Sequence, residues 1–209
     1  MKIECVKEKL QEAVSKVEKV TGKNLTLPIL SNVYLEVKKD SLIIKSTNLN
    51  VGVEINIPGK TSKTGSVVVS GNILQSLVQN IVDPKITLEK IENTLLVSSK
   101  NTSTTIKTVP GEDFPSIPTI TMRESFSIQT KDFLEGVRSV WYAASVSSMK
   151  PELSSVFLTH NEDEVVFVAT DSFRLAEKKI RVKKLQKFSD ILIPVKNIID
   201  IIKIGRAHV

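Results

Sequence analysis

Few side chains in this 209-residue chain have catalytic potential, because it holds one cysteine and two histidines. His160 falls in a predicted turn, His160–Asp163, where no third group is expected to hold the imidazole against a nucleophile, as Ser–His–Asp chemistry requires. Cys5 lies on the apolar side of an alternating run, which predicts a buried structural thiol. Gly22–Lys23 lacks the glycine spacing of a phosphate loop, and Glu112–Asp113 has no partner at metal-ligand spacing. We predict no enzymatic activity, no metal and no cofactor.

Basic side chains form a second group with chemical potential, because they can bind phosphate. The net charge is +6, and the segment Ser172–Asp190 alone carries +5, with only Glu177 and Asp190 as acids. Such a segment is typical of a solvated surface, and the alternative is contact with an anionic partner such as nucleic acid. Its basic residues are Arg174, Lys178, Lys179, Arg181, Lys183, Lys184 and Lys187.

An internal repeat organises the elements that must position these residues. A shift of 123 residues aligns 28–57 with 151–180 without a gap, and nine of the thirty aligned positions are identical. Apolar residues also stay opposite apolar residues upstream, where Leu10, Val14 and Val17 face Phe133, Val137 and Val140. The chain is therefore two copies of one unit of about 120 residues.

Each copy shows the same order of periodic patterns. A short alternating strand opens it (Ile3 and Cys5 in one copy, Phe126 and Ile128 in the other), and an amphipathic helix follows. The complete order in the first copy is β-α-β-β-β-β-α-β-β-β. Strands dominate, which predicts an α+β fold in which two helices pack on an antiparallel sheet in each unit.

The second copy is incomplete, because no counterparts of the three closing strands follow its second helix, Val195–Lys203. An incomplete sheet exposes an unpaired edge, so we expect the chain to be part of a longer protein. Residues 204–209 interrupt the helical pattern and match what a common sequencing adapter encodes in one frame. They are a candidate non-native tail, and His208 is given no role. The predicted domains are 1–121 and 122–209.

Lysines lie off the apolar face of the first helix, and basic residues do so on its counterpart in the second copy. If equivalent helices lined one surface, weak phosphate contacts would add up without reading bases. The alternative is a solvated face, on which Glu8, Glu12 and Glu18 offset the lysines. The DNA-facing candidates from this spacing are Lys9, Lys16, Lys19, Lys23, Lys131, Arg138 and Lys150.

The sequence contains no pattern typical of a membrane protein. Its apolar runs are shorter than the ~18–20 residues of a membrane helix. The start, Met1–Glu4, lacks the apolar core of a signal peptide. We therefore expect a cytoplasmic protein with no membrane partner.

Several motifs resemble those of the bacterial sliding clamp family, the beta subunits of the replicative DNA polymerase. Leu27–Val33 (Leu-Pro-Ile-Leu-Ser-Asn-Val) followed by Ser46–Leu49 resembles the first clamp domain, and Val109–Pro115 resembles the end of that domain. Val168–Ala176 (Val-Ala-Thr-Asp-Ser-Phe-Arg-Leu-Ala) resembles the most distinctive second-domain motif, and Ile193–Lys196 matches a late strand-to-helix step. Each motif is weak alone, but together with the repeat they are specific.

The resemblance implies clamp-type domains, three per chain, of which the third is absent here. It also implies that two chains join head to tail into a homodimeric ring around double-stranded DNA. Such a clamp tethers the replicative polymerase and other replication and repair proteins, and a clamp loader is a further expected partner. Because a closed ring gives processivity topologically, DNA contacts need only be weak and sequence-independent.

The resemblance also implies a groove beside the Ala-Thr-Asp motif, into which partner peptides insert apolar side chains. Ser172–Phe173 departs from the Gly-His or Gly-Tyr common there, so the aromatic is kept and the glycine is lost. Asn24 stands where a basic residue is common, with Lys23 beside it, and Lys196 joins the DNA-facing set. For Leu153 and Leu175 the alternative is core packing. The groove residues carried over are Leu153, Thr170, Ser172, Phe173, Arg174 and Leu175.

A function of another class stays open: a single-chain, sequence-independent DNA-binding module that uses the basic segment 174–187. This alternative predicts strong, salt-dependent binding to linear DNA. The clamp hypothesis predicts weak binding to linear DNA, because retention needs a closed ring.

Overall fold

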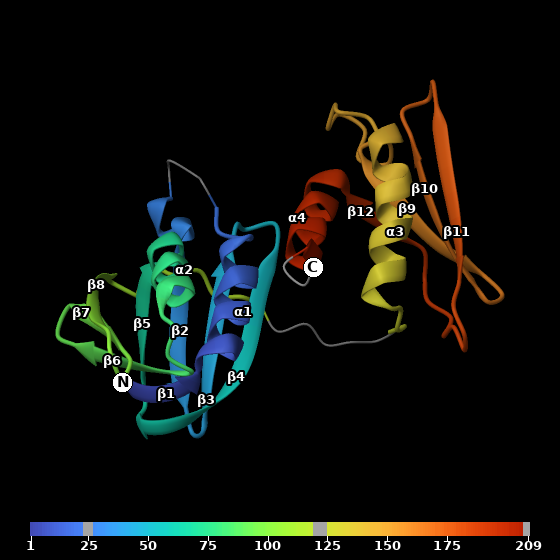
Figure 1. Cartoon of the computed structure of the whole chain (residues 1–209). Helices are drawn as coiled ribbons and strands as arrows, with labels where there is room; N and C mark the ends of the chain where they lie inside the picture. The colour runs from blue at the N-terminus through green and yellow to red at the C-terminus, as the bar shows by residue number, and fades with distance from the viewer. Residues whose placement is uncertain (23–26, 119–124, 207–209) are drawn as a thin grey trace. The chain divides into compact units, whose positions relative to one another are not determined.

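The structure is a computed structural model that describes residues 1–22, 27–118 and 125–206 (Figure 1). It divides into two compact units, unit 1 (Met1–Pro118) and unit 2 (Thr119–Val209). The predicted boundary between residues 121 and 122 lies outside the described residues.

Unit 1 has the predicted order of helices and strands, with one 3-10 turn, Pro28–Ser31, added before β2. Alternating apolar residues form the strands, and the two helices place their apolar positions at helical spacing. The elements are β1 (Lys2–Val6), α1 (Lys7–Glu18), β2 (Asn32–Lys38), β3 (Ser41–Thr47), β4 (Gly52–Lys63), β5 (Gly65–Ser70), α2 (Gly71–Asn80), β6 (Lys85–Ile91), β7 (Thr94–Ser98) and β8 (Ser103–Val109).

The strands of unit 1 close on themselves in the order β1-β4-β3-β2-β5-β8-β7-β6, and every neighbouring pair is antiparallel. The antiparallel pairing was predicted, but the closure was not. Closure depends on the length of β4, whose first half pairs with β3 and whose residues from Gly59 to Lys63 pair with β1. The hydrophobic pattern of β4 predicts a strand, but it does not predict which two strands β4 pairs with.

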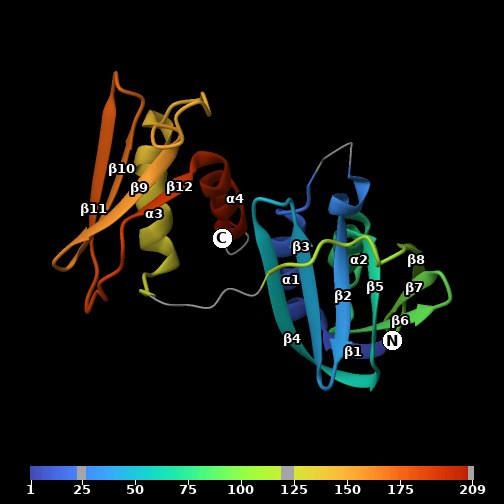
Figure 2. The same cartoon turned by 180° about the vertical axis from the view of Figure 1, so that it is seen from behind.

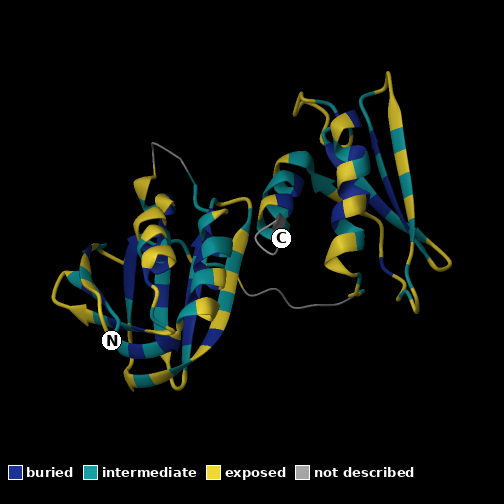
Figure 3. Cartoon of the chain, viewed as in Figure 1, coloured by how far each residue is buried: buried dark blue, intermediate teal, exposed yellow. Residues whose placement is uncertain are grey.

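Helices α1 and α2 lie side by side on one face of strands β2 to β5 (Figures 1 and 2). Their exposed residues lie mainly on the side away from the strands (Figure 3). Ser46 of β3 is buried, and its hydroxyl donates to the Val17 carbonyl at 2.6 Å, which ties β3 to the last turn of α1. Besides Gly71, the buried residues of the two helices are Leu10, Ala13, Val14, Val17, Leu74 and Val78.

Unit 2 confirms the repeat. Its elements are α3 (Thr130–Val140), a 3-10 turn (Trp141–Ala143), β9 (Ser155–Asn161), β10 (Glu164–Thr170), β11 (Leu175–Arg181), β12 (Ile191–Pro194) and α4 (Val195–Arg206). Strands β9 and β10 lie 123 residues after β2 and β3, and α3 and β11 begin 123 residues after α1 and β4. The strand order β11-β10-β9-β12 reproduces β4-β3-β2-β5, so Val33–Leu35 and Val156–Leu158 occupy equivalent strands.

The predicted opening strand of the second copy is wrong, because residues 125–129 form no strand. In unit 1, β1 is held between the second half of β4 and β6. Strand β11 ends at Arg181, and the described residues contain no counterpart of β6, so this segment has no strand to pair with. Phe126 instead stacks its ring on Phe188 with the centroids 4.0 Å apart.

The predicted end of the last helix at Lys203 is also wrong, because α4 continues to Arg206. Gly205 lies so close to α3 that a Cβ placed on it would come within 2.7 Å of a Leu134 methyl carbon. A glycine at this point therefore lets α4 continue beside α3, although glycine is a poor helix former. His208 lies outside the described residues.

A small residue facing a large one defines the core of unit 2. A Cβ placed on Gly136 of α3 would come within 2.4 Å of the fully buried ring of Phe167 in β10. The positions 123 residues earlier hold Ala13 and Ile44, both buried in the core of unit 1. One unit therefore combines glycine with phenylalanine where the other combines alanine with isoleucine, which keeps the total volume similar.

We predict that Gly136→Ala destabilises unit 2 by roughly 1–2 kcal/mol, because overpacking outweighs the gain in helix propensity. The double change Gly136→Ala with Phe167→Ile should recover much of the loss, since it recreates the pair of unit 1. Urea unfolding followed by the fluorescence of Trp141, the chain's single tryptophan, reports on this unit. Arg138→Ala at an exposed position of α3 is the control, and a stable Gly136→Ala protein would contradict the packing argument.

Candidate functional site

The turn between β10 and β11 carries most of the predicted groove residues, and two polar side chains fix its backbone. The Thr170 hydroxyl donates to the Arg174 carbonyl at 2.7 Å and accepts from the Ser172 amide at 3.1 Å. The Asp171 carboxylate accepts from the amides of Phe173 and Arg174, both at 3.0 Å. Ser172 adopts a φ of 77°, in the left-handed region that favours glycine, so this hydrogen-bonded turn tolerates the loss of glycine noted in the sequence.

Unit 1 builds the same turn between β3 and β4. The Thr47 hydroxyl donates to the Val51 carbonyl at 2.9 Å and accepts from the Leu49 amide at 3.0 Å. The Asn48 side-chain oxygen accepts from the amides of Asn50 and Val51, at 3.1 and 2.9 Å. Leu49 has a φ of 70°, close to that of Ser172. The two turns share one backbone conformation and differ in the side chains that they expose.

Unit 2 displays apolar side chains at this turn. Phe173 is 98% exposed and Leu175 is 67% exposed, so core packing of Leu175 is excluded. Val146 and Met149, in the loop that precedes β9, are also almost fully exposed. Large apolar side chains in solvent contribute little to the stability of the unit itself, and where they adjoin one another they are typical of a surface that binds a partner.

Leu153 joins this end of the sheet. It lies two residues before β9, and because β9 and β10 are antiparallel, the start of β9 lies beside the end of β10. Leu153 is half-buried, and its carbonyl accepts from the Ser145 amide at 2.8 Å. The structure thus brings the six predicted groove residues to one end of one sheet, and the groove itself stays a prediction.

Asp171 is a residue of this site that the sequence analysis missed. Hydrogen bonds from the backbone amides of Arg174 and Phe173, together with the nearby guanidinium, lower the pKa of its carboxyl. The guanidinium Nε of Arg174 donates to the second carboxylate oxygen at 3.0 Å. An aspartate that accepts from amides two and three residues later is a recognised turn pattern, and the sequence Asp171–Arg174 carries that signal.

The basic segment 174–187 is more neutralised than its sequence suggests. Arg174 pairs with Asp171 at 3.0 Å, and Lys179 pairs with Glu177 at 3.3 Å. Lys178 reaches Glu135 of α3 at 2.7 Å, and Arg181 reaches Glu164 of β10 at 3.4 Å. A count of charges along the chain misses acids that tertiary structure brings alongside, so the field of this segment is weaker than a local charge of +5 implies.

The residues predicted to face DNA, all basic except Asn24, divide into three groups. Lys9, Lys131, Arg138, Lys150 and Lys196 are exposed. Lys16 pairs with Glu12 at 2.7 Å, and Lys19 pairs with Glu18 at 3.6 Å. Lys23 and Asn24 lie outside the described residues. The exposed set lies on α1, on its counterpart α3, on α4 and in the loop before β9.

The candidates for catalysis are poorly placed. Cys5 is buried in β1, and burial, with a smaller effect of Glu4, raises the pKa of its thiol to about 11. His160 does not lie in a turn as predicted. It pairs with Val165 inside β9, because a turn of only Glu162 and Asp163, with Glu162 at a φ of 48°, joins the strands.

Candidate metal clusters and membrane-spanning helices are absent from the part of the chain that the structure describes. No group of three or more histidine, cysteine or acidic side chains there could hold a metal ion. No helix among these residues is both long and apolar enough to cross a membrane.

Comparison with known proteins gives two family matches and many relatives. Residues 1–118 match the model of the DNA polymerase III beta subunit, N-terminal domain, and residues 127–208 match that of its central domain. A "Beta sliding clamp" of Staphylococcus aureus is 24% identical over 195 residues, which covers 89% of this chain and 52% of the relative. One of Rickettsia felis is 27% identical over 186 residues, covering 88% and 49%. The chain therefore spans about half the length of the curated relatives it matches.

Solved structures show the same fold. The DNA polymerase III beta subunit of Thermotoga maritima has a TM-score of 0.86 and 25% identity, and the match covers 99% of this chain and 56% of that one. The Helicobacter pylori beta clamp bound to a DNA ligase peptide has a TM-score of 0.77 and 22% identity, with 97% and 58% covered. Since the first family model alone matches more than half of the residues, and the second follows it in the family's order, the chain belongs to the DNA polymerase III beta subunit family.

Proposed function

We propose that the protein to which this chain belongs is a sliding clamp, a non-catalytic cytoplasmic ring that encircles duplex DNA and tethers the replicative polymerase. The observation that carries the proposal is that two units of one architecture follow one another in the order of the family's first two domains. The rest of the relatives' length would supply the third domain. Two complete chains would then close the ring.

The proposed DNA-facing surface consists of the basic residues on and beside α1, its counterpart α3 and α4, together with Asn24. Exposed lysine and arginine side chains attract phosphate without reading bases, which is what a ring that slides requires. Pairing of Lys16 and Lys19 with glutamates of their own helix keeps that attraction weak. The proposed residues are Lys9, Lys16, Lys19, Lys23, Asn24, Lys131, Arg138, Lys150 and Lys196.

The proposed partner site is the end of the unit 2 sheet that displays Phe173 and Leu175. Its residues are Leu153, Thr170, Ser172, Phe173, Arg174 and Leu175, and its occupants would be short peptide motifs of the polymerase, the clamp loader and other replication proteins. The exposure of the two apolar side chains supports this assignment. The peptide-bound clamp of Helicobacter pylori, which has the same fold, supports peptide binding as the mode.

The alternative, a DNA-binding arm formed by residues 174–187, is less well supported. Four of its seven basic side chains pair with carboxylates. Exposed ion pairs exchange partners easily, so pairing does not abolish binding, but it reduces the gain from each phosphate contact.

We predict that Phe173→Ala or Leu175→Ala weakens binding of a polymerase-derived clamp-binding peptide by roughly 1–3 kcal/mol, the range for an apolar anchor. The measurement is a calorimetric titration of the complete protein that includes the third domain. Leu49→Ala is the matched control, because Leu49 is 58% exposed at the equivalent turn of unit 1. Unchanged affinity in both unit 2 variants, with the fold intact, would show that the site is misplaced.

We predict that Asp171→Ala also weakens this peptide, whereas Asp171→Asn retains most of the affinity, because unit 1 builds the same turn with Asn48. The pKa of Asp171 is lowered, so its contribution is complete above the ordinary aspartate range near ~3.9 and is lost as the pH falls through the folded-state value. The Asn variant should lack this acid-dependent loss. The pH-dependent amide shifts of Phe173 and Arg174 report on the turn, and equal effects of Ala and Asn would refute its positioning role.

We predict that the 209-residue chain binds linear duplex DNA weakly, with a shallow dependence on salt, and that changing Lys183, Lys184 and Lys187 to glutamine has little effect. An arm that contacts seven phosphates would instead give a slope of log K against log salt near −6, at about −0.9 for each contact. Fluorescence anisotropy at several salt concentrations separates the two outcomes. The complete protein should remain on a circular plasmid and leave once that plasmid is cut.

A further inference from the structure

Strand β5 of unit 1 is only partly paired on one of its edges. Along the other edge it pairs with β2 from Gly65 to Ser70. On the edge towards β8, pairing is limited to Val68 with Val109 and Val69 with Thr108. Within the described residues, the stretch Gly65–Val67 has no strand partner on this side. A partly unpaired edge offers backbone donors and acceptors to a further strand.

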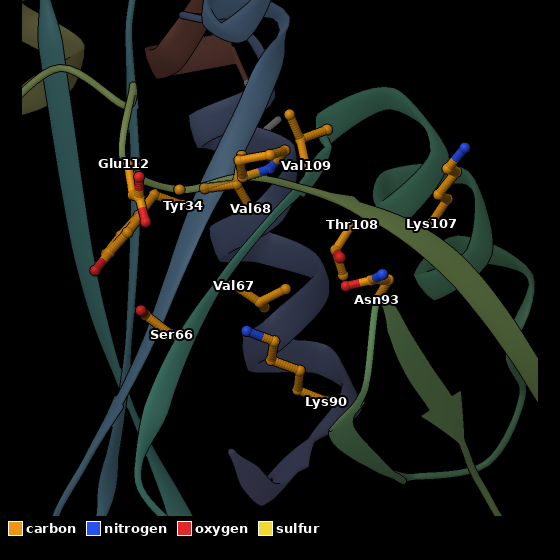
Figure 4. A pocket seen from close by; sticks show the side chains of 12 residues that line it. Tyr34, Ser66, Val67, Val68, Lys90, Asn93, Lys107, Thr108, Val109 and Glu112 are labelled. Carbon is orange, nitrogen blue, oxygen red and sulfur yellow. The ribbon is translucent and has the colours of Figure 1, made fainter.

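A hollow of about 690 Å³ lies beside this open edge (Figure 4). It has three walls: β5 itself, the end of β8 with the segment that follows it up to Glu112, and the end of β6 with the turn into β7. A volume of this size is within the range of sites that hold small ligands or a few residues of a peptide. The lining residues outside β5 include Tyr34, Lys90, Asn93, Lys107, Thr108 and Glu112.

The segment that follows β8 is held away from β5, so the opening is built into the fold. The ring of Phe114 packs on Tyr34 of β2 with the centroids 5.4 Å apart. A Cβ placed on Gly111 would lie 3.4 Å from a methyl carbon of Val68, which shows that the segment crosses the outer face of the sheet. Since Val68 is fully buried beneath it, the segment cannot rejoin the edge of β5 without exposing this valine.

The hollow is basic. Lys90 and Lys107 stand on different walls, and neither forms an ion pair with any of the described residues. Glu112 is the acid among the lining residues. The α-amino group of Met1 lies beside Gly65, and its pKa is lowered by burial and then by the nearby charges of Lys63 and Lys90. Lys90 therefore lies near the start of the open edge, and the lining of the hollow carries two lysines against one glutamate.

We propose that this hollow is a second docking site, for an acidic extended segment of a partner protein that adds a strand to β5 at Gly65–Val67. Main-chain hydrogen bonds would give the affinity, and carboxylates of the segment would meet Lys90 and Lys107. The site belongs to unit 1 and is separate from the turn of unit 2. It does not depend on the proposed clamp function.

The experiment uses the 209-residue chain and two capped hexapeptides, one alternating valine with glutamate and the other alternating valine with lysine. Amide shifts in two-dimensional NMR spectra report where each peptide binds. The acidic peptide should shift the amides of Gly65, Ser66 and Val67 in a saturable manner, and the basic peptide should not. Lys90→Glu and Lys107→Glu should each weaken the acidic peptide by roughly fivefold, as expected for a solvent-accessible ion pair.

Lys100→Glu is the matched control, because it changes the charge of unit 1 equally from the turn between β7 and β8. It should leave the affinity unchanged. Equal binding of the two peptides, equal effects of all three variants, or shifts elsewhere in unit 1 would overturn the proposal. Displacement of the acidic peptide by a short DNA duplex that shifts the same amides would also overturn it, since the hollow would then bind nucleic acid.

Discussion

The rest of the structure depends on how the first helix of each unit packs against one strand. That strand is β3 in unit 1 and β10 in unit 2. Ile44 of β3 and Phe167 of β10 are fully buried, and each belongs to the core that the helix covers. Side chains alternate along a strand, so a slip of one residue would turn these positions out of the core. Burial therefore fixes the strand register, and the register in turn fixes where Thr47 and Thr170 end their strands and begin the turn.

Much of the fold could be predicted from the sequence, because helical and strand periodicities are local patterns. The repeat also shows most of these patterns in both copies. What could not be predicted depends on partners far away in the chain. Closure of unit 1 requires one strand, β4, to pair with both β3 and β1. The segment 125–129 has the alternation of a strand, but the described residues offer it no strand to pair with. Ion pairs such as Lys178 with Glu135 are likewise invisible before the sheet and helix meet.

Less of the candidate site than of the fold could be predicted, because the residues that build its turn also build the equivalent turn of unit 1. Threonine and an Asx residue hold the backbone in both units, so the motif Thr-Asp is partly a structural signal rather than a functional one. The functional signal is what the turn displays, and no local pattern separates an exposed Phe173 from a buried one. The Asp171 carboxylate fixes the turn by accepting from its amides, and it also pairs with the guanidinium of Arg174, which the turn exposes. In unit 1 the equivalent residues are Asn48 and Val51, and these cannot form such a pair.

The charges on and beside the helices also favour weak binding of DNA. On α1 and just after it, Lys16 and Lys19 pair with Glu12 and Glu18, and a phosphate that approached would compete with these glutamates. An exposed pair contributes only ~0–1 kcal/mol, so the exchange from carboxylate to phosphate is nearly neutral in free energy. If such a surface faces DNA, as proposed, these two lysines would attract it over a short distance but hold no single position along it, because their contacts can be replaced by internal ones. In the proposed clamp, retention on DNA would then come from enclosure by the ring rather than from these contacts.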